Sequence, residues 1–136
     1  MIIEINDALT VGEISDVFSS GFPYLSIALF KDPHAWGKAS SFKEKLPADK
    51  AIAEIRKVNT PGALEIHGWH QTRTVEQEFG KIFGLYVQVL RKEGAAWIQT
   101  ADTDPRTLEE QNEAGRNASQ ELLDGTDKRF NNENPA

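Results

Sequence analysis

The residues best suited to chemistry lie together in one short motif, His67-Gly68-Trp69-His70. Two imidazoles at this separation can exchange protons or ligate a metal ion. On a strand the two histidines point to opposite faces, whereas on a turn they converge. His34 and Asp32 would complete a zinc-ligand set, but the helical spacing of zinc motifs is absent. We therefore predict no metal or other cofactor, and histidines at a strand end that bond to solvent or backbone.

A basic segment between residues 31 and 57 is the second candidate, with seven Lys or Arg residues and four acidic ones, a net charge of +3. One interpretation is a lid over the sheet that binds an anionic ligand; the favoured one is a solvated loop whose aromatic side chains pack onto the domain. A ligand site would lie between the 31–47 connector and the histidine motif. Its candidate residues are His34, Trp36, Lys38, Lys43, Lys45, His67, Trp69 and His70.

The remaining candidates have simpler interpretations. Asp102, Asp104, Glu109 and Glu110 crowd an expected helix start, where carboxylates complement the helix dipole. The chain has no cysteine, which excludes disulfides, thiolate metal sites and a cysteine nucleophile. The three tryptophans, at 36, 69 and 97, could line a cleft, but we expect them to fill the core.

Two segments of similar pattern provide the scaffold for these candidate residues. Each is predicted to form a strand, a helix and a second strand. Residues 2–30 and 63–91 match at a gap-free offset of 61, which pairs Ile3 with Leu64 and Phe18 with Phe79. Thr10 with Glu13 forms a capping-box signal at the first helix, and Thr74 with Gln77 forms one at the second. The pattern predicts an internal repeat, although any two strand–helix–strand units share such features.

The apolar faces of these units follow from residue spacing. The first helix carries Val11, Ile14, Val17 and Phe18 on one side, and the second carries Val75, Phe79, Ile82 and Phe83. The following strands alternate, so that Leu25, Ile27 and Leu29, and then Leu85, Val87 and Val89, face inward. Both helices are therefore expected to rest against one common sheet.

Three further elements are expected outside the two units. A hairpin with its turn at residues 91–94 leads into a strand over residues 95–100. Asp104 and Pro105 open a polar helix that ends near Gly125. A short helix that starts at Pro47 carries Ile52, Ile55 and Val58.

These elements predict an α+β fold in which the two units interleave into a mostly antiparallel four-stranded sheet. This topology resembles the ferredoxin-like arrangement over about residues 1–100, with an added hairpin strand and extra helices. That scaffold serves many unrelated activities, so the resemblance implies no functional residues. We expect one domain over residues 1–123 and a polar, mobile tail over residues 124–136.

Charge and composition narrow the function. The chain is acidic, with a net charge of −6, so phosphate-backbone binding to nucleic acid is not expected. Membrane association is not expected either, because no apolar run approaches the ~20 residues of a bilayer span. The N-terminus lacks a signal-peptide pattern, which favours a cytoplasmic location. We predict a non-catalytic binding or assembly module that self-associates, with a possible protein partner at the C-terminal helix. The alternative is a small enzyme or an anionic-ligand-binding domain that uses the candidate site.

Overall fold

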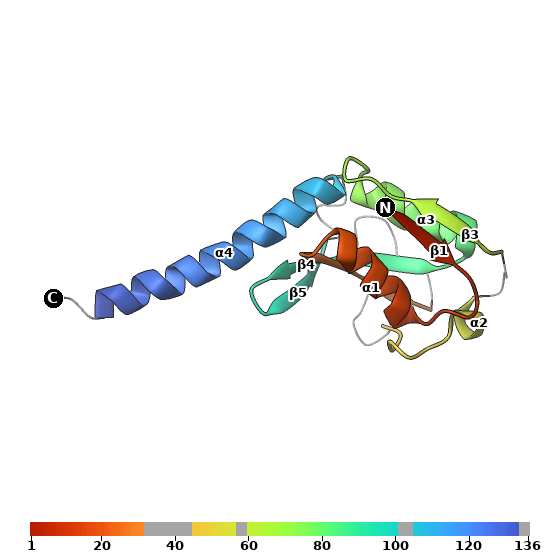
Figure 1. Ribbon diagram of the computed structural model, residues 1–136, viewed down its shortest axis with the longest axis horizontal. Helices are drawn as coiled ribbons and strands as arrows, with labels where there is room; N and C mark the ends of the chain where they lie inside the picture. Colours follow the sequence, from red (N-terminus) through yellow and green to blue (C-terminus); the bar gives the residue numbers. More distant parts are fainter. Residues whose placement is uncertain (32–44, 57–59, 101–104, 134–136) are drawn as a thin grey trace.

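A computed structural model describes the backbone of residues 1–31, 45–56, 60–100 and 105–133, and side chains in these ranges up to residue 120 (Figure 1). The chain contains helices and antiparallel strands, which makes it an α+β protein. The strands are β1 (Ile2–Ile5), β2 (Leu25–Phe30), β3 (Gly62–Glu65), β4 (Tyr86–Glu93) and β5 (Ala96–Gln99). The helices are α1 (Val11–Gly21), α2 (Ile52–Ile55), α3 (Thr72–Phe83) and α4 (Leu108–Glu133).

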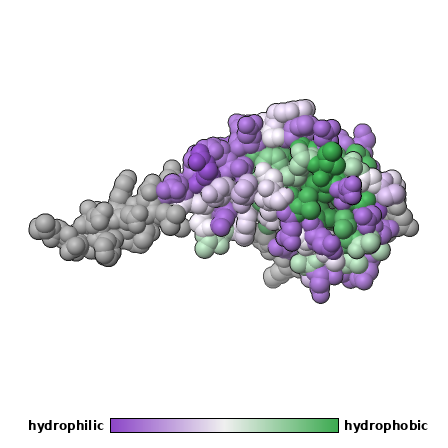
Figure 2. Space-filling model, viewed as in Figure 1, coloured by the Kyte–Doolittle hydropathy of each residue, from purple (hydrophilic) through white to green (hydrophobic). Residues whose placement is uncertain are grey.

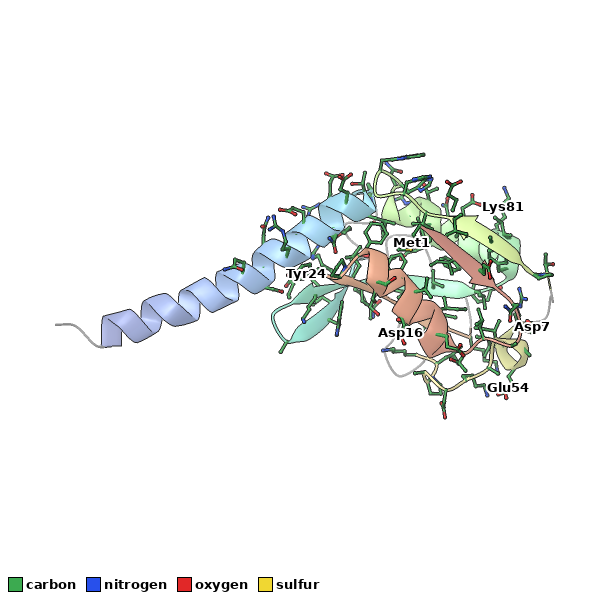
Figure 3. All side chains as sticks on the ribbon, viewed as in Figure 1. Met1, Asp7, Asp16, Tyr24, Glu54 and Lys81 are labelled. Carbon is green, nitrogen blue, oxygen red and sulfur yellow. The ribbon has the colours of Figure 1, made fainter. Side chains whose placement is uncertain are left out.

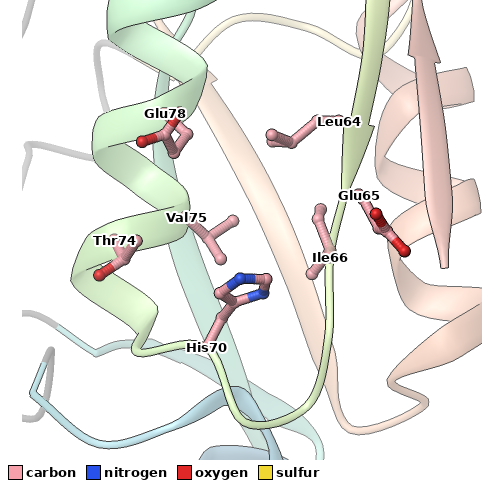
Figure 4. Close-up of a pocket in the computed structure, with 7 residues that line it drawn as sticks. All are labelled: Leu64, Glu65, Ile66, His70, Thr74, Val75 and Glu78. Atoms are coloured by element: carbon pink, nitrogen blue, oxygen red, sulfur yellow. The ribbon is translucent and has the colours of Figure 1, made fainter.

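The strands divide into two sheets, so the single four-stranded sheet of the ferredoxin-like prediction is not confirmed. β1 pairs with β3, and β2 pairs with β4, which in turn pairs with β5. All three pairings are antiparallel. The prediction placed four strands side by side, but the β1–β3 ribbon lies between α1 and α3, and among the described strands it pairs with neither β2 nor β4 (Figures 1 and 4).

One hydrophobic core joins both strand–helix–strand units, as the apolar patterns predicted. It contains Phe18 of α1 and Phe79 of α3, each fully buried, together with the inward-facing residues of β2 and β4. Two residues of the predicted helix faces are outside it, because Val17 is 43% exposed and Ile82 is 40% exposed. Each of these positions lies at the margin of a helix face that is buried elsewhere.

The two helix starts differ in how well local sequence predicted them. At α1, the Thr10 side chain accepts from the Glu13 N–H and Glu13 bonds back to Thr10, which confirms the capping box. The predicted box at Thr74 is wrong, because α3 already begins at Thr72. The early start is stabilised from a distance, since the Thr72 N–H and hydroxyl both donate to the Arg106 carbonyl at 2.9 Å.

The other predicted elements form with shifted boundaries. The hairpin turn lies at Gly94 and Ala95, where Gly94 takes a φ of 64°, so β4 runs through the residues assigned to the turn. α2 is a single turn that begins later than the predicted start at Pro47. α4 begins after the predicted start and continues to Glu133, past the predicted end at Gly125.

A buried arginine joins three segments on the α2 side of the domain. The side chain of Arg56 is fully buried, and its Nε donates to the Asp7 carboxylate at 2.7 Å. Its Nη1 donates to the carbonyls of Thr60 and Phe83 at 2.8 and 3.3 Å. Asp7 follows β1 and lies near α2 in Figure 3, so this contact ties the start of the chain to the end of α3.

The first turns of α4 pack on β2 and β4 at close range. Tyr24 donates its backbone N–H to Asn112 at 2.9 Å, and Arg91 donates to the Gln111 side chain at 2.8 Å. A Cβ atom on Gly115 would lie 3.0 Å from Tyr24 Cβ and 3.1 Å from the Lys92 carbonyl oxygen. Glycine is therefore what allows the helix to approach the sheet this closely. Beyond this contact α4 extends away from the rest of the domain (Figure 1).

Candidate functional site

The histidine motif forms a tight turn between β3 and α3 on which three aromatic rings lie in contact. His70 donates its backbone N–H to the His67 carbonyl, and the His67 N–H donates to His70 Nδ1 at 2.9 Å. Because Nδ1 accepts this bond, the neutral form of His70 carries its proton on Nε2. The Trp69 ring lies 5.3 Å from the ring of His67, nearly parallel to it, and 4.1 Å from that of His70. The two histidines converge. The His70 ring bonds to backbone, as predicted, whereas the His67 ring pairs with the Glu65 carboxylate.

The start of α4 fixes this turn. The N–H groups of Leu108 and Glu109 donate to the carbonyls of His70 and Gly68, each at 2.9 Å. The first N–H groups of a helix have no partner within it, so here the turn satisfies them. A Cβ on Gly68 would lie 3.3 Å from Glu109 Cβ, which shows how closely the two segments pack.

A capping box that our sequence analysis missed closes the start of α4. The Glu110 N–H donates to the Thr107 hydroxyl at 3.1 Å, and the Thr107 N–H donates to the Glu110 carboxylate at 3.0 Å. The same T-x-x-E signal was recognised at Thr10 and could have been found here. Instead, the prediction used Asp104 and Pro105, and Asp104 lies outside the described residues.

We predict that this capping box makes the start of α4 sensitive to acid. The backbone N–H and then the hydroxyl of Thr107 hold the pKa of the Glu110 carboxyl below its usual range, assisted by the charge of Arg106. Since the folded-state pKa is the lower one, the stabilisation is present above the unfolded-state pKa and is lost as the pH falls through the folded-state value.

The measurement is a carbon-detected NMR titration of Glu110 in the full chain and in a Thr107→Val variant. We expect the midpoint of Glu110 to lie lower in the wild-type chain than in the variant, which lacks the hydroxyl donor. Equal midpoints in the two proteins would show that the hydroxyl of Thr107 does not stabilise the ionised carboxylate.

A small pocket opens between β3 and α3, directly beside the turn (Figure 4). Its interior of about 20 Å³ has room for little more than one water molecule and is mostly apolar. Figure 4 shows the His70 ring between Ile66 on one wall and Val75 on the other. The complete lining is Leu64, Glu65, Ile66, His70, Thr74, Val75 and Glu78.

Lys45 lies in a different pocket from the histidines. It lines a groove between α1, β2 and residues 46–48, where the hydroxyls of Ser15 and Ser26 are 3.0 Å apart. Figure 1 places α2 and the turn between β3 and α3 on opposite sides of the domain. The structure therefore brings His67, Trp69 and His70 together and leaves Lys45 apart from them. The predicted site residues His34, Trp36, Lys38 and Lys43 lie outside the described residues.

The expectation that tryptophans fill the core is wrong for both of those that the structure describes. Trp69 is 66% exposed on the turn, and Trp97 is 39% exposed on the short strand β5. The third, Trp36, lies outside the described residues. Large aromatic side chains that remain exposed are common at protein interfaces, where they contribute much of the binding energy.

An ion pair lies at the histidine turn. His67 Nε2 lies 3.1 Å from the Glu65 carboxylate, with both side chains substantially exposed. Among the described residues, no group of three or more His, Cys, Asp or Glu side chains is placed to hold a metal ion. Asp32 and His34, which the zinc hypothesis required, are not among them. Within the same part of the chain, none of the helices combines the length and apolar character of a bilayer span.

Comparisons with known proteins add no family assignment. The chain matches no protein-family model and shows no significant similarity to a curated protein or to a solved structure.

Proposed function

We propose that the chain is a non-catalytic assembly module that associates with a second copy of itself. The observation that supports this most directly is an apolar area over the start of β1 and the adjacent part of α1 (Figure 2). Ile2 is 62% exposed and Val17 is 43% exposed, and the partly buried Met1 packs onto the core next to them. Contiguous exposed apolar surface on a small domain typically marks an interaction site.

The path of α4 also supports an assembly role. Its buried residues among those with described side chains are Leu108, Gln111 and Gly115, which lie on the part of the helix that packs on the sheet. A polar helix draws most of its stability from packing against another surface rather than from its own propensity. We therefore propose that a partner packs against the part of α4 whose backbone extends beyond the domain (Figure 1). A cytoplasmic location remains a prediction.

The acidic residues around the apolar area predict how salt affects self-association. Residues 1–30 carry four acidic and no basic residues, and Glu4 and Asp16 are exposed beside the area. A symmetric contact would bring like charges of the two copies near one another. Salt screens such repulsion between exposed groups, so self-association is expected to strengthen as ionic strength rises.

Sedimentation equilibrium of the full chain, from low to high micromolar concentration and at two salt levels, tests this proposal. We expect a concentration-dependent dimer that is more populated at high salt. An Ile2→Glu, Val17→Glu variant should remain monomeric, while Ile82→Glu, a comparable change at an exposed position on α3, should dimerise like the wild type. A strictly monomeric wild-type chain under all conditions would refute the proposal.

A further inference from the structure

The groove that Lys45 lines separates α1 from the outer edge of β2 and is large enough for a small molecule. It encloses about 430 Å³, within the range of about 300–1,000 Å³ that small-molecule sites occupy. The Gly12 N–H donates to the Ala48 carbonyl at 2.9 Å, and the Leu46 N–H donates to the Leu29 carbonyl at 2.8 Å. The third wall of the groove is therefore fixed to both α1 and β2.

The backbone of Ile27 offers this groove one donor and one acceptor. Lys92 donates its N–H to the Tyr24 carbonyl, so the even-numbered residues of β2 bond to β4 and the odd-numbered ones face the outer edge. On that edge Leu25 and Leu29 each accept a hydrogen bond. Among the described contacts, the N–H and carbonyl of Ile27 have no partner, although Ile27 is buried and lines the groove. A molecule that supplies both partners would satisfy two buried backbone groups.

A pair of serine hydroxyls gives the groove a further donor. Ser15 of α1 and Ser26 of β2 both line the groove, and their hydroxyl oxygens lie 3.0 Å apart. Two hydroxyls have two hydrogens, and the bond between them uses only one. In the described part of the chain neither hydroxyl has another acceptor, so one O–H donor is available to a molecule in the groove.

One negative and one positive side chain also line the groove. Asp16, which Figure 3 marks on α1, and Lys45 are both exposed. Within the ranges that the structure describes, neither takes part in an ion pair. A carboxylate and an ammonium group that do not pair with each other are complementary to the two ends of a zwitterion.

We propose that the groove between α1, β2 and residues 45–48 binds a small zwitterion that carries an amide group, of which a dipeptide is the simplest example. Lys45 attracts its carboxylate and Asp16 attracts its ammonium group, while the backbone of Ile27 and the serine pair bond to its amide. The site lies apart from the β1–α1 apolar area, because Val17 points to the other flank of α1. It therefore goes beyond the proposed self-association.

The probes are glycylglycine and alanylalanine, and the readout is the amide spectrum of the ¹⁵N-labelled full chain. We expect saturable shifts at Ser15, Ile27 and Leu46, and slower hydrogen exchange of the Ile27 N–H in the complex. Exchange of the Ala28 N–H should not change, because the alternation directs that group to β4. The proposal fails if neither dipeptide produces saturable shifts at millimolar concentration.

Free alanine tests the role of the amide, because it is a zwitterion of the same charge without that group. We expect alanine to bind more weakly than alanylalanine and to leave the exchange of the Ile27 N–H unchanged. Equal affinities of the two ligands would overturn the assignment of the Ile27 backbone as part of the site.

Blocked dipeptides and a lysine variant test the two charges. N-acetyl-glycylglycine lacks the ammonium group and glycylglycinamide lacks the carboxylate, so each should bind about twofold to fivefold more weakly, the effect of one exposed charge pair. In Lys45→Gln, glycylglycine should lose its advantage over glycylglycinamide. Lys50→Gln, the same change at a lysine that does not line the groove, should keep that advantage. Equal effects of the two substitutions would overturn the assignment of Lys45.

The same variants separate ligand binding from self-association. Sedimentation of Lys45→Gln should match that of the wild type, and the Ile2→Glu, Val17→Glu variant should still bind glycylglycine. Loss of ligand binding in the monomeric variant would show that the groove forms only in the dimer, which would overturn the separation of the two surfaces.

Discussion

Replacement of Asp7 by alanine is expected to lower the free energy of unfolding by about 3 kcal/mol, the lower end of the range for a buried ion pair that loses one partner, because Arg56 is fully buried but Asp7 is 29% exposed. The variant would leave the Arg56 guanidinium buried, with only the carbonyls of Thr60 and Phe83 as acceptors. Removal of a charge from water is costly unless an opposite charge offsets it. The loss should therefore exceed the value of one ordinary hydrogen bond.

Urea unfolding of the full chain, followed by circular dichroism, measures this effect. The Asp7→Ala, Arg56→Met double variant should be considerably more stable than the sum of the two single changes predicts, because it removes both charges together. Glu54→Ala is the control, since its pair with Lys50 is exposed and should cost only about 0–1 kcal/mol. Similar losses for Asp7→Ala and Glu54→Ala would show that burial of Arg56 does not raise the cost.

Substitution of Gly115 by alanine is expected to destabilise the protein by about 1–3 kcal/mol, the typical cost of overpacking a close contact. The added methyl group would lie 3.0 Å from Tyr24 Cβ and 3.1 Å from both Arg91 Cγ and the Lys92 carbonyl oxygen. Two of these three atoms are backbone or directly attached to it, so the clash is relieved only by a shift of the strand backbone or of α4 itself. The cost should outweigh the gain in helix propensity of about 1 kcal/mol.

Gly80→Ala is the matched control, because Gly80 also lies inside a helix but has room for a methyl group. Its nearest neighbours, Leu85 O and Tyr86 Cδ1, lie at 3.8 and 3.9 Å, which is ordinary contact. We expect Gly80→Ala to raise stability by about 0.5–1 kcal/mol, opposite in sign to Gly115→Ala. Stabilisation by both substitutions would mean that α4 does not approach the sheet as closely as described.

Local pattern predicted the parts of the fold that depend on nearby residues. The inward faces of β2 and β4 follow from the alternation of apolar residues along each strand. The start of α1 follows from the capping box between Thr10 and Glu13, which are three residues apart. The start of α3 did not follow, because the partner of Thr72 is Arg106, thirty-four residues away. The partition into two sheets likewise depends on how the helices pack, which residue spacing alone does not encode.

The candidate site was predictable in its chemistry but not in its surroundings. The histidine motif stood out by composition, and its two imidazoles do converge on a turn. Its contact with α4 joins segments about forty residues apart, so no local signal revealed it. The exposure of Trp69 was also hidden, because an aromatic residue next to a strand is equally suited to a core and to an interface.

The bonds from Leu108 and Glu109 to the turn give α4 a mechanical property. A helix of 26 residues is about 39 Å long at 1.5 Å per residue, and its near end grips the carbonyls of Gly68 and His70. The close contact of Gly115 with the sheet lies between this anchored end and the part of α4 that extends beyond the domain. A force that tilts the C-terminal part of α4 would therefore also move the turn at Gly68 and His70, and with it the ring of Trp69.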